Sequence, residues 1–187
     1  LDVRDERLAV AYNRCPGRHQ CGLLVLDTET GDERLTWDPE TDGQRRVGDV
    51  TLVDRGLVLA SHGDYCGYRL DDRGGEHWCV PLATPERVDG ESVYAYPNHV
   101  HATADGVAFV TGNTYPEDGR ETEARPPSEH TAFGYTLGGD RTWTRPVGGF
   151  ATGIGTDDEQ IAVPAAQHFR DRDATAHGLG VFGLTDG

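Results

Sequence analysis

One two-strand unit recurs four times along the chain, and a recurring unit narrows the choice of fold more than any single motif does. Its clearest copy runs from Gly22 to Trp37: an apolar run, a Thr-Gly turn and a second run that ends on tryptophan. Apolar, β-rich runs that are interrupted by turn residues predict a hairpin. The copies centre on four leucines spaced 44, 67 and 47 residues apart: Leu26, Leu70, Leu137 and Leu184.

A second hairpin lies between the copies of the first. Its post-turn apolar residues lie 49, 50 and 54 residues apart, at Leu8, Leu57, Val107 and Ile161. Two hairpins per repeat make four antiparallel strands, which is one blade of a β-propeller. We therefore expect an all-β propeller segment with about four blades, covering residues 1–46, 47–97, 98–148 and 149–187. The first blade lacks most of its first strand and the fourth lacks its last, which predicts a slice of a larger propeller.

The net charge of the chain is −15, and all of its 17 basic residues are arginine. Such an acidic surface repels phosphates and anionic lipid, so we expect neither a nucleic-acid partner nor direct membrane insertion. Many carboxylates without lysine also resemble the proteins of haloarchaea. In molar salt the screening length falls to a few ångströms and self-repulsion becomes tolerable. The alternative is an ordinary soluble acidic protein.

The four cysteines each have a neighbour close in sequence. Cys15 and Cys21 flank a short loop, and Cys66 and Cys79 flank a hairpin. An even count with local partners favours the disulfides Cys15–Cys21 and Cys66–Cys79, and with them an extracellular or cell-surface location. A metal site and unpaired core thiols are the alternatives, although neither spacing is typical of zinc ligands.

The connections between strands are distributed unequally over the two faces of the predicted propeller. Those on one face are tight turns, whereas those on the other are long, and long loops on a rigid scaffold are where binding residues collect. The longest, residues 112–131, is predicted to be a mobile insertion or a lid. Seven of the eight histidines fall on or beside this long-loop face.

His99 and His101 alternate on a predicted innermost strand, so their side chains point to the same side. With a third ligand from another blade, His62 or His168, they would suit Zn²⁺ or Cu²⁺. The alternative is a solvated strand start with water-bonded rings.

Aromatic residues gather in the same loops, at Tyr65, Tyr68, Tyr94, Tyr96 and Tyr115. Tyrosines at a propeller mouth can form a recognition surface for a protein or a sugar. Equally, Tyr94 and Tyr96 can pack as an ordinary connecting strand. The tryptophans have a structural interpretation: Trp37, Trp78 and Trp143 are predicted to hold one repeated position between neighbouring blades.

The repeat resembles that of pyrroloquinoline-quinone-like (PQQ-like) β-propellers. Val25-Leu26-Asp27-Thr28-Glu29-Thr30-Gly31 followed by Trp37 is similar to the Ala-Leu-Asp-x-x-Thr-Gly-x-x-x-Trp signature of that family, although Trp37 lies two residues late. The family includes quinone dehydrogenases that carry the quinone and Ca²⁺, and non-catalytic scaffolds that resemble a bacterial outer-membrane assembly lipoprotein. The dehydrogenases use an adjacent cysteine pair that this chain lacks.

Two functional hypotheses follow. The favoured one is a non-catalytic scaffold without a cofactor, which binds a protein or glycan partner through His62, Tyr65, Tyr94, Tyr96, His99, His101 and His168. The alternative is an oxidoreductase that depends on PQQ with Ca²⁺, or on Zn²⁺ or Cu²⁺ at His99 and His101. An enzyme requires these histidines to converge, whereas a scaffold does not.

Overall fold

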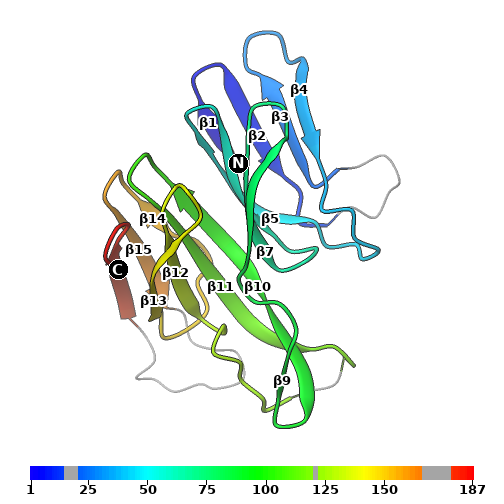
Figure 1. The fold of residues 1–187 in the computed structure, drawn as a ribbon, viewed down its shortest axis with the longest axis vertical. Coiled ribbons are helices and arrows are strands. Elements are labelled where there is room, and N and C mark those ends of the chain that lie inside the picture. The colour runs from blue at the N-terminus through cyan, green and yellow to red at the C-terminus, as the bar shows by residue number, and fades with distance from the viewer. Residues whose placement is uncertain (15–20, 120–121, 166–177) are drawn as a thin grey trace.

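The computed structural model describes residues 1–14, 21–119, 122–165 and 178–187, and every regular element in these ranges is a β-strand (Figure 1). The strands form four antiparallel sheets that follow one another along the chain. Sheet I contains β1 (Asp2–Arg4), β2 (Arg7–Ala11), β3 (Leu23–Asp27) and β4 (Glu33–Trp37). Sheet II contains β5 (Val47–Val53), β6 (Gly56–Ser61), β7 (Cys66–Leu70) and β8 (Glu76–Pro81).

The third and fourth sheets depart from four strands. Sheet III contains β9 (Glu86–Val88), β10 (Glu91–Ala102), β11 (Val107–Pro116), β12 (Thr131–Tyr135) and β13 (Arg141–Pro146). The described part of sheet IV contains β14 (Gly155–Thr156), β15 (Gln160–Ala165) and β16 (Gly178–Gly183). Within each sheet the spatial order of the strands follows their order in sequence.

Antiparallel four-stranded meanders in succession are the blades of a β-propeller, so the predicted fold class is confirmed. The blade boundaries at residues 46, 97 and 148 stay a prediction, and β10 runs as one strand through the second of them. No helix of a length and apolar character able to cross a membrane occurs among the described residues.

The hydrophobic core lies between the sheets, in three separate clusters. One joins sheets I and II, the second joins II and III, and the third joins III and IV. We call these three contact zones seams. β6 is buried along its whole length because one of its faces packs in the cluster with sheet I and the other in the cluster with sheet III. The outer strand β8 is largely exposed. Each blade therefore depends on its neighbours for burial, as expected of a repeat fold.

Two aspartates tie the inner strands of neighbouring sheets together. The backbone N–H of Leu52 donates to Asp2 Oδ2 at 2.6 Å, and that of Val100 donates to Asp49 Oδ2 at 3.1 Å. Burial raises the pKa of Asp49, and the bonds from Val100 and Val50 oppose that shift. These carboxylates link sheets I, II and III at the strands nearest the propeller axis.

The strand register corrects the predicted alignment of the later repeats. Val107 pairs with Tyr135 and Ile161 pairs with Phe182. Tyr135 and Phe182 therefore hold the place of Leu70 in sheet II, two residues before the leucines that the sequence pattern indicated. A shift of two residues keeps the same side of a strand, so the apolar pattern alone does not reveal it.

The register also shows that the prediction for Trp37 was wrong. Trp78 lies opposite Arg69 and Trp143 lies opposite Gly134, each just before a register shift. The residue at that place in sheet I is Leu35, and Trp37 follows it by two residues. The longer step from the turn to Trp37 therefore places the indole two residues further along the strand, on the same side as Leu35.

The other two tryptophans close their seams in the same way. Trp78 Nε1 donates to the carbonyl of Leu137 at 3.1 Å, and Trp143 Nε1 donates to that of Leu184 at 3.1 Å. Each indole also lies against a glycine of the next turn, Gly139 or Gly187, where an added Cβ would come within 2.9 Å of the ring. Trp78 and Trp143 thus have the structural role predicted for them.

Candidate functional site

An arm formed by the outer ends of β10 and β11, with β9 paired to β10, extends sheet III beyond the blade on the long-loop side. The sequence predicted loops over residues 81–98 and 112–131, but β10 already begins at Glu91 and β11 continues to Pro116. Tyr94 lies directly opposite Tyr115 in this arm. The arm appears in Figure 1 where β10 and β11 run down towards β9. Hairpin pairing between the two predicted loops is what the sequence interpretation missed.

Beyond β11, the described residues of the 112–131 connection include several buried side chains. Thr122, Ala124 and Ser128 are buried, and the guanidinium of Arg125 lies 3.3 Å from the carboxylate of Glu129. The described parts of this connection therefore pack against the fold, and the mobile insertion or lid stays a prediction.

Four tyrosine rings meet at the arm, and we call them the tyrosine surface: Tyr65, Tyr94, Tyr96 and Tyr115. The ring centroids of Tyr65 and Tyr94 are 4.7 Å apart, and those of Tyr94 and Tyr115 are 6.0 Å apart. Tyr96 lies 5.4 Å from both Tyr94 and Tyr115. These separations are those of interacting aromatic pairs. Tyr115 is 37% exposed, so the cluster opens to solvent.

Tyr65 is held by its backbone in a conformation that few tyrosines adopt. Its φ angle is +65°, in the left-handed region. Its carbonyl oxygen accepts two hydrogen bonds, from the N–H groups of Leu82 and Ala83, each at 3.2 Å. Because this turn fixes the chain between β6 and β7, the Tyr65 ring reaches across to the arm.

His62 supports the surface from below. Its ring stacks on Tyr96 with 4.7 Å between centroids, and the residue is only 6% exposed. The Pro97 carbonyl and the Asn98 side chain lie beside its nitrogens without the alignment of a full hydrogen bond. Burial, with a smaller contribution from Arg45, lowers the pKa of His62 to about 4. The ring is therefore neutral near pH 7.

Arg45 adds a cation to the same place, and nothing in the sequence pattern indicated it. Its Cζ atom lies 5.2 Å from the centroid of the Tyr96 ring, within cation–π range. Arg45 belongs to the connection between sheets I and II. Its contact with Tyr96 of sheet III therefore brings that connection to the same ring that His62 of sheet II contacts. Only the folded structure brings residues so distant in sequence together.

The phenol groups of Tyr65 and Tyr94 stay neutral. Burial is the main cause that raises the pKa of Tyr65, and the neighbouring Tyr96 and the carboxylate of Glu117 add to it. Burial and the Tyr96 hydroxyl raise the pKa of Tyr94. Neutral phenols offer both a donor and an acceptor to a partner.

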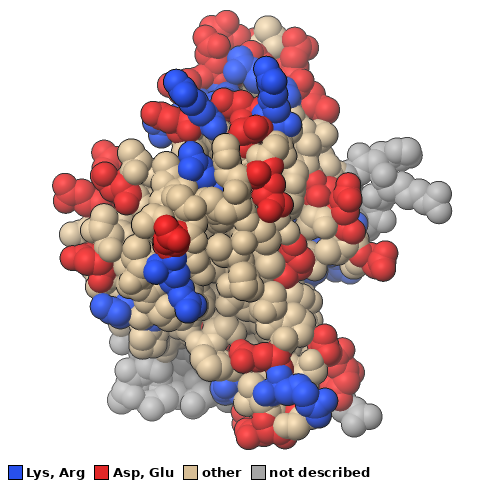
Figure 2. Space-filling view, in the orientation of Figure 1, with Lys and Arg blue, Asp and Glu red and all other residues tan. Residues whose placement is uncertain are grey.

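Figure 2 shows acidic side chains at the edges of the visible face and broad uncharged areas between them.

The predicted histidine ligands are not brought together among the described residues. His99 Nε2 bonds with the carbonyl of Ala151 at 3.1 Å, and His101 Nε2 bonds with that of Asp157 at 2.9 Å. Both rings thus lie on the same side of β10, as their alternation predicts. Each one, however, contacts a different backbone carbonyl rather than a shared ligand position. No cluster of three or more potential metal-binding side chains occurs in the described parts of the chain. His168 lies outside them.

The predicted disulfides meet two different outcomes. Cys15 lies outside the described residues, so the Cys15–Cys21 bond stays a prediction. Cys66 and Cys79 are free thiols, and the predicted bond between them is not present. Cys66 lies opposite Pro81 rather than opposite Cys79, so the two cysteines are diagonal neighbours. Burial, followed by the charge of Asp64, raises the pKa of Cys66, which leaves it protonated.

Tyr68 does not belong to the tyrosine surface. Its hydroxyl donates to the carboxylate of Asp64, and its ring lies 5.0 Å from that of Trp37 in the seam between sheets I and II. Of the predicted binding face, the structure therefore brings together His62, Tyr65, Tyr94 and Tyr96, and it places His99 and His101 elsewhere on β10.

No known protein family matches the chain, and no curated protein matches it either. Solved structures do resemble it along most of its length. A computationally designed protein called Ika8 covers 97% of the chain at 10% identity, with a TM-score of 0.43. BamB from Moraxella catarrhalis covers 96% at 12% identity, with a TM-score of 0.34. A protein of unknown function from Bacteroides caccae covers 87% at 9% identity, with a TM-score of 0.35.

The chain corresponds to only part of each of these structures, namely 56%, 67% and 66% of their lengths. At such identities and TM-scores the likenesses identify no function. The assignment of blades rests on the strand order of the chain itself.

Proposed function

We propose that the chain is a non-catalytic binding module whose tyrosine surface holds a segment of a protein partner. The observation that carries the proposal is the contact of four tyrosine rings from three separate segments at the end of the arm. A blade does not need this cluster, because the hydrophobic core lies in the seams between sheets.

The chemistry of the surface suits protein recognition. Tyrosine combines a large apolar ring with a hydroxyl and has few rotatable bonds, so it binds with little loss of conformational entropy. The Tyr94 and Tyr96 hydroxyls lie 3.5 Å apart and offer paired polar contacts beside the rings. The stacking of His62 and Arg45 on Tyr96 keeps that ring in place before a partner arrives.

The proposal also covers the repeat family, the kind of organism and the cellular location. We propose a PQQ-like propeller repeat from a high-salt organism, located at the cell surface or outside the cell. Its support is the repeat motif and the charge of −15 without lysine. Counting free thiols in protein isolated without reductant tests the location, because an oxidising compartment would leave fewer than four.

Peptide-display selection on the purified chain in molar salt tests the binding role. We expect enriched sequences whose binding is lost in a Tyr94→Ala/Tyr115→Ala variant and retained in Tyr12→Ala, an exposed tyrosine outside the surface. A glycan array run in parallel separates the two partner classes. Enrichment that survives the double substitution, or binding to glycans alone, would contradict the proposal.

The oxidoreductase alternative has its own test. Metal analysis and an ultraviolet–visible spectrum, recorded on protein purified without chelator, reveal stoichiometric Zn, Cu or Ca, or a quinone band. A metal whose content falls in a His99→Ala/His101→Ala variant would replace the scaffold proposal.

A further inference from the structure

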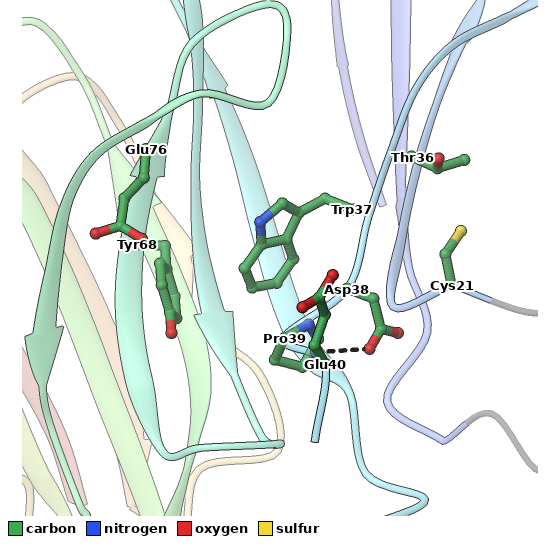
Figure 3. A pocket seen from close by; sticks show the side chains of 8 residues that line it. All are labelled: Cys21, Thr36, Trp37, Asp38, Pro39, Glu40, Tyr68 and Glu76. Atoms are coloured by element: carbon green, nitrogen blue, oxygen red, sulfur yellow. Dashed lines mark hydrogen bonds between the residues drawn. The ribbon is translucent and has the colours of Figure 1, made fainter. Parts of the chain in front are cut away.

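A second aromatic site lies in the seam between sheets I and II, lined by residues other than those of the tyrosine surface. A cavity of about 490 Å³ opens there (Figure 3). Such a volume falls in the range of small-molecule sites. The cavity is lined by Cys21, Thr36, Trp37, Asp38, Pro39, Glu40, Tyr68 and Glu76.

Trp37 is available to this cavity because Leu35 occupies the repeated seam position. In Figure 3 the indole projects from the end of β4 towards Tyr68 on the neighbouring sheet. The two ring centroids are 5.0 Å apart and the planes are inclined by 59°. Two non-parallel faces of this kind form an open corner rather than a closed stack, and indole is the aromatic ring that attracts cations most strongly.

The charged side chains that line the cavity are all carboxylates: Asp38, Glu40 and Glu76. Asp38 is already engaged: Oδ2 accepts hydrogen bonds from the Gly22 N–H at 3.0 Å and lies 3.1 Å from Nε of Arg46. Glu40 and Glu76, in contrast, have no ion-pair partner among the described residues. Glu40 lies in the connection that follows β4 and Glu76 lies at the start of β8, so the two side chains line the cavity from different segments (Figure 3).

Glu40 is held in place by its own turn. Its φ angle is +56°, which is uncommon for a residue other than glycine, asparagine or aspartate. The Asp38 side chain stabilises this conformation, since the Glu40 N–H donates to Asp38 Oδ1 at 2.9 Å. Strained conformations that the surrounding structure maintains cluster at ligand sites. The field of the carboxylates also reaches Cys21, whose pKa burial raises and whose neighbours Glu33 and Asp38 raise further.

We propose that this cavity binds an organic cation of the quaternary or methylated ammonium class. The cation would lie in the corner between Trp37 and Tyr68, with Glu40 and Glu76 balancing its charge. Methylated ammonium groups are weakly hydrated and favour aromatic faces, whereas Na⁺ and K⁺ retain their water. The site therefore discriminates by ring contact as well as by charge. The same group can come from a free small molecule or from a methylated lysine of a partner chain.

The test uses choline and 3,3-dimethylbutan-1-ol, its neutral isostere, in titrations followed by the indole N–H signals in ¹H–¹⁵N spectra of the whole chain. We expect choline to shift the Trp37 signal, assigned through Trp37→Phe, and to leave Trp78 and Trp143 unchanged. The neutral isostere should bind at least about tenfold more weakly, because it lacks the charge. Equal binding of the two probes, or no shift with either, overturns the proposal.

Variants separate the contributions of ring and charge. Trp37→Leu should weaken choline binding about tenfold or more, and Glu76→Gln by several-fold. The matched control is Glu86→Gln, an exposed strand glutamate of sheet III, and it should leave binding unchanged. A trimethyl-lysine peptide forms the second arm: tighter binding than choline assigns the cation to a partner chain, and weaker binding assigns it to a free ligand. A Glu86→Gln effect as large as that of Glu76→Gln would show non-specific charge attraction and overturn the site.

Discussion

Between sheets II and III, and again between sheets III and IV, a tryptophan occupies the repeated position and donates its indole N–H to a backbone carbonyl of the next sheet. Between sheets I and II, Leu35 occupies that position and Trp37 faces a cavity instead. The same residue type therefore closes two seams and lines a pocket in the third. A repeat fold requires an apolar residue at the seam, and Leu35 supplies it here, so Trp37, two residues later, lines the cavity instead.

The largest expected difference between the seams concerns stability. Trp143→Ala removes a buried indole and its hydrogen bond, so we expect the free energy of unfolding to fall by about 3–5 kcal/mol. Trp37→Ala removes a ring that is partly exposed, and we expect a loss of only about 1–2 kcal/mol. Denaturant unfolding in molar salt measures both. Equal losses would show that Trp37 also closes its seam.

The seam between sheets II and III should depend on pH through His62, which packs under Tyr96. The pKa of histidine is near 6.5 in an unfolded chain, and burial lowers that of His62 to about 4. As the pH falls from 6.5 towards 4, the unfolded chain takes up a proton that the folded chain does not. The free energy of unfolding should therefore fall by about 3 kcal/mol over this range.

Unfolding curves between pH 7 and 4 measure this effect, with His62→Phe as the matched variant that keeps an aromatic ring against Tyr96. The variant should lose the part of the pH dependence that His62 causes, while the part that comes from the carboxylates remains. An unchanged slope in the variant would show that His62 is not the group responsible.

The smallest expected change in stability comes from Leu35→Trp, a substitution that would give the seam between sheets I and II the same tryptophan as the other two seams. A cavity of about 270 Å³ lies beside Leu35 and is bordered by Asp72, which holds the place that Leu137 holds in sheet III. Leu35→Trp has room for an indole and a backbone carbonyl within the same turn. We expect a gain of about 1 kcal/mol in the free energy of unfolding. Destabilisation would mean that the first seam is already closely packed around leucine.

The fold was largely predictable, because hairpin periodicity and turn residues are local signals. The continuous apolar run Leu57-Val58-Leu59 and the turn at Asp54-Arg55-Gly56 indicate strands without reference to the rest of the chain. The two-residue shift of Tyr135 and Phe182 was not predictable, since either register keeps apolar residues on the same side of the strand.

The candidate site was predictable only in part. Tyr94 and Tyr96 could be proposed as neighbours because alternate residues of a strand share a side. Their contact with Tyr65 and Arg45 depends on how three segments far apart in sequence come together, which no local pattern contains. The Cys66–Cys79 pair shows the same limit, because a difference of two residues in strand register turns directly opposed partners into diagonal ones.

The arm that carries Tyr94, Tyr96 and Tyr115 joins its blade through two register shifts, on either side of Pro97. The first shift adds a residue on β11 and the second adds one on β10, so the registers above and below Pro97 are set separately. We therefore expect that hairpins of other lengths could replace the arm beyond Pro97 while the blade keeps its own pairing. Because side chains alternate along a strand, such grafts keep the tyrosines' orientation only when each strand changes by an even number of residues.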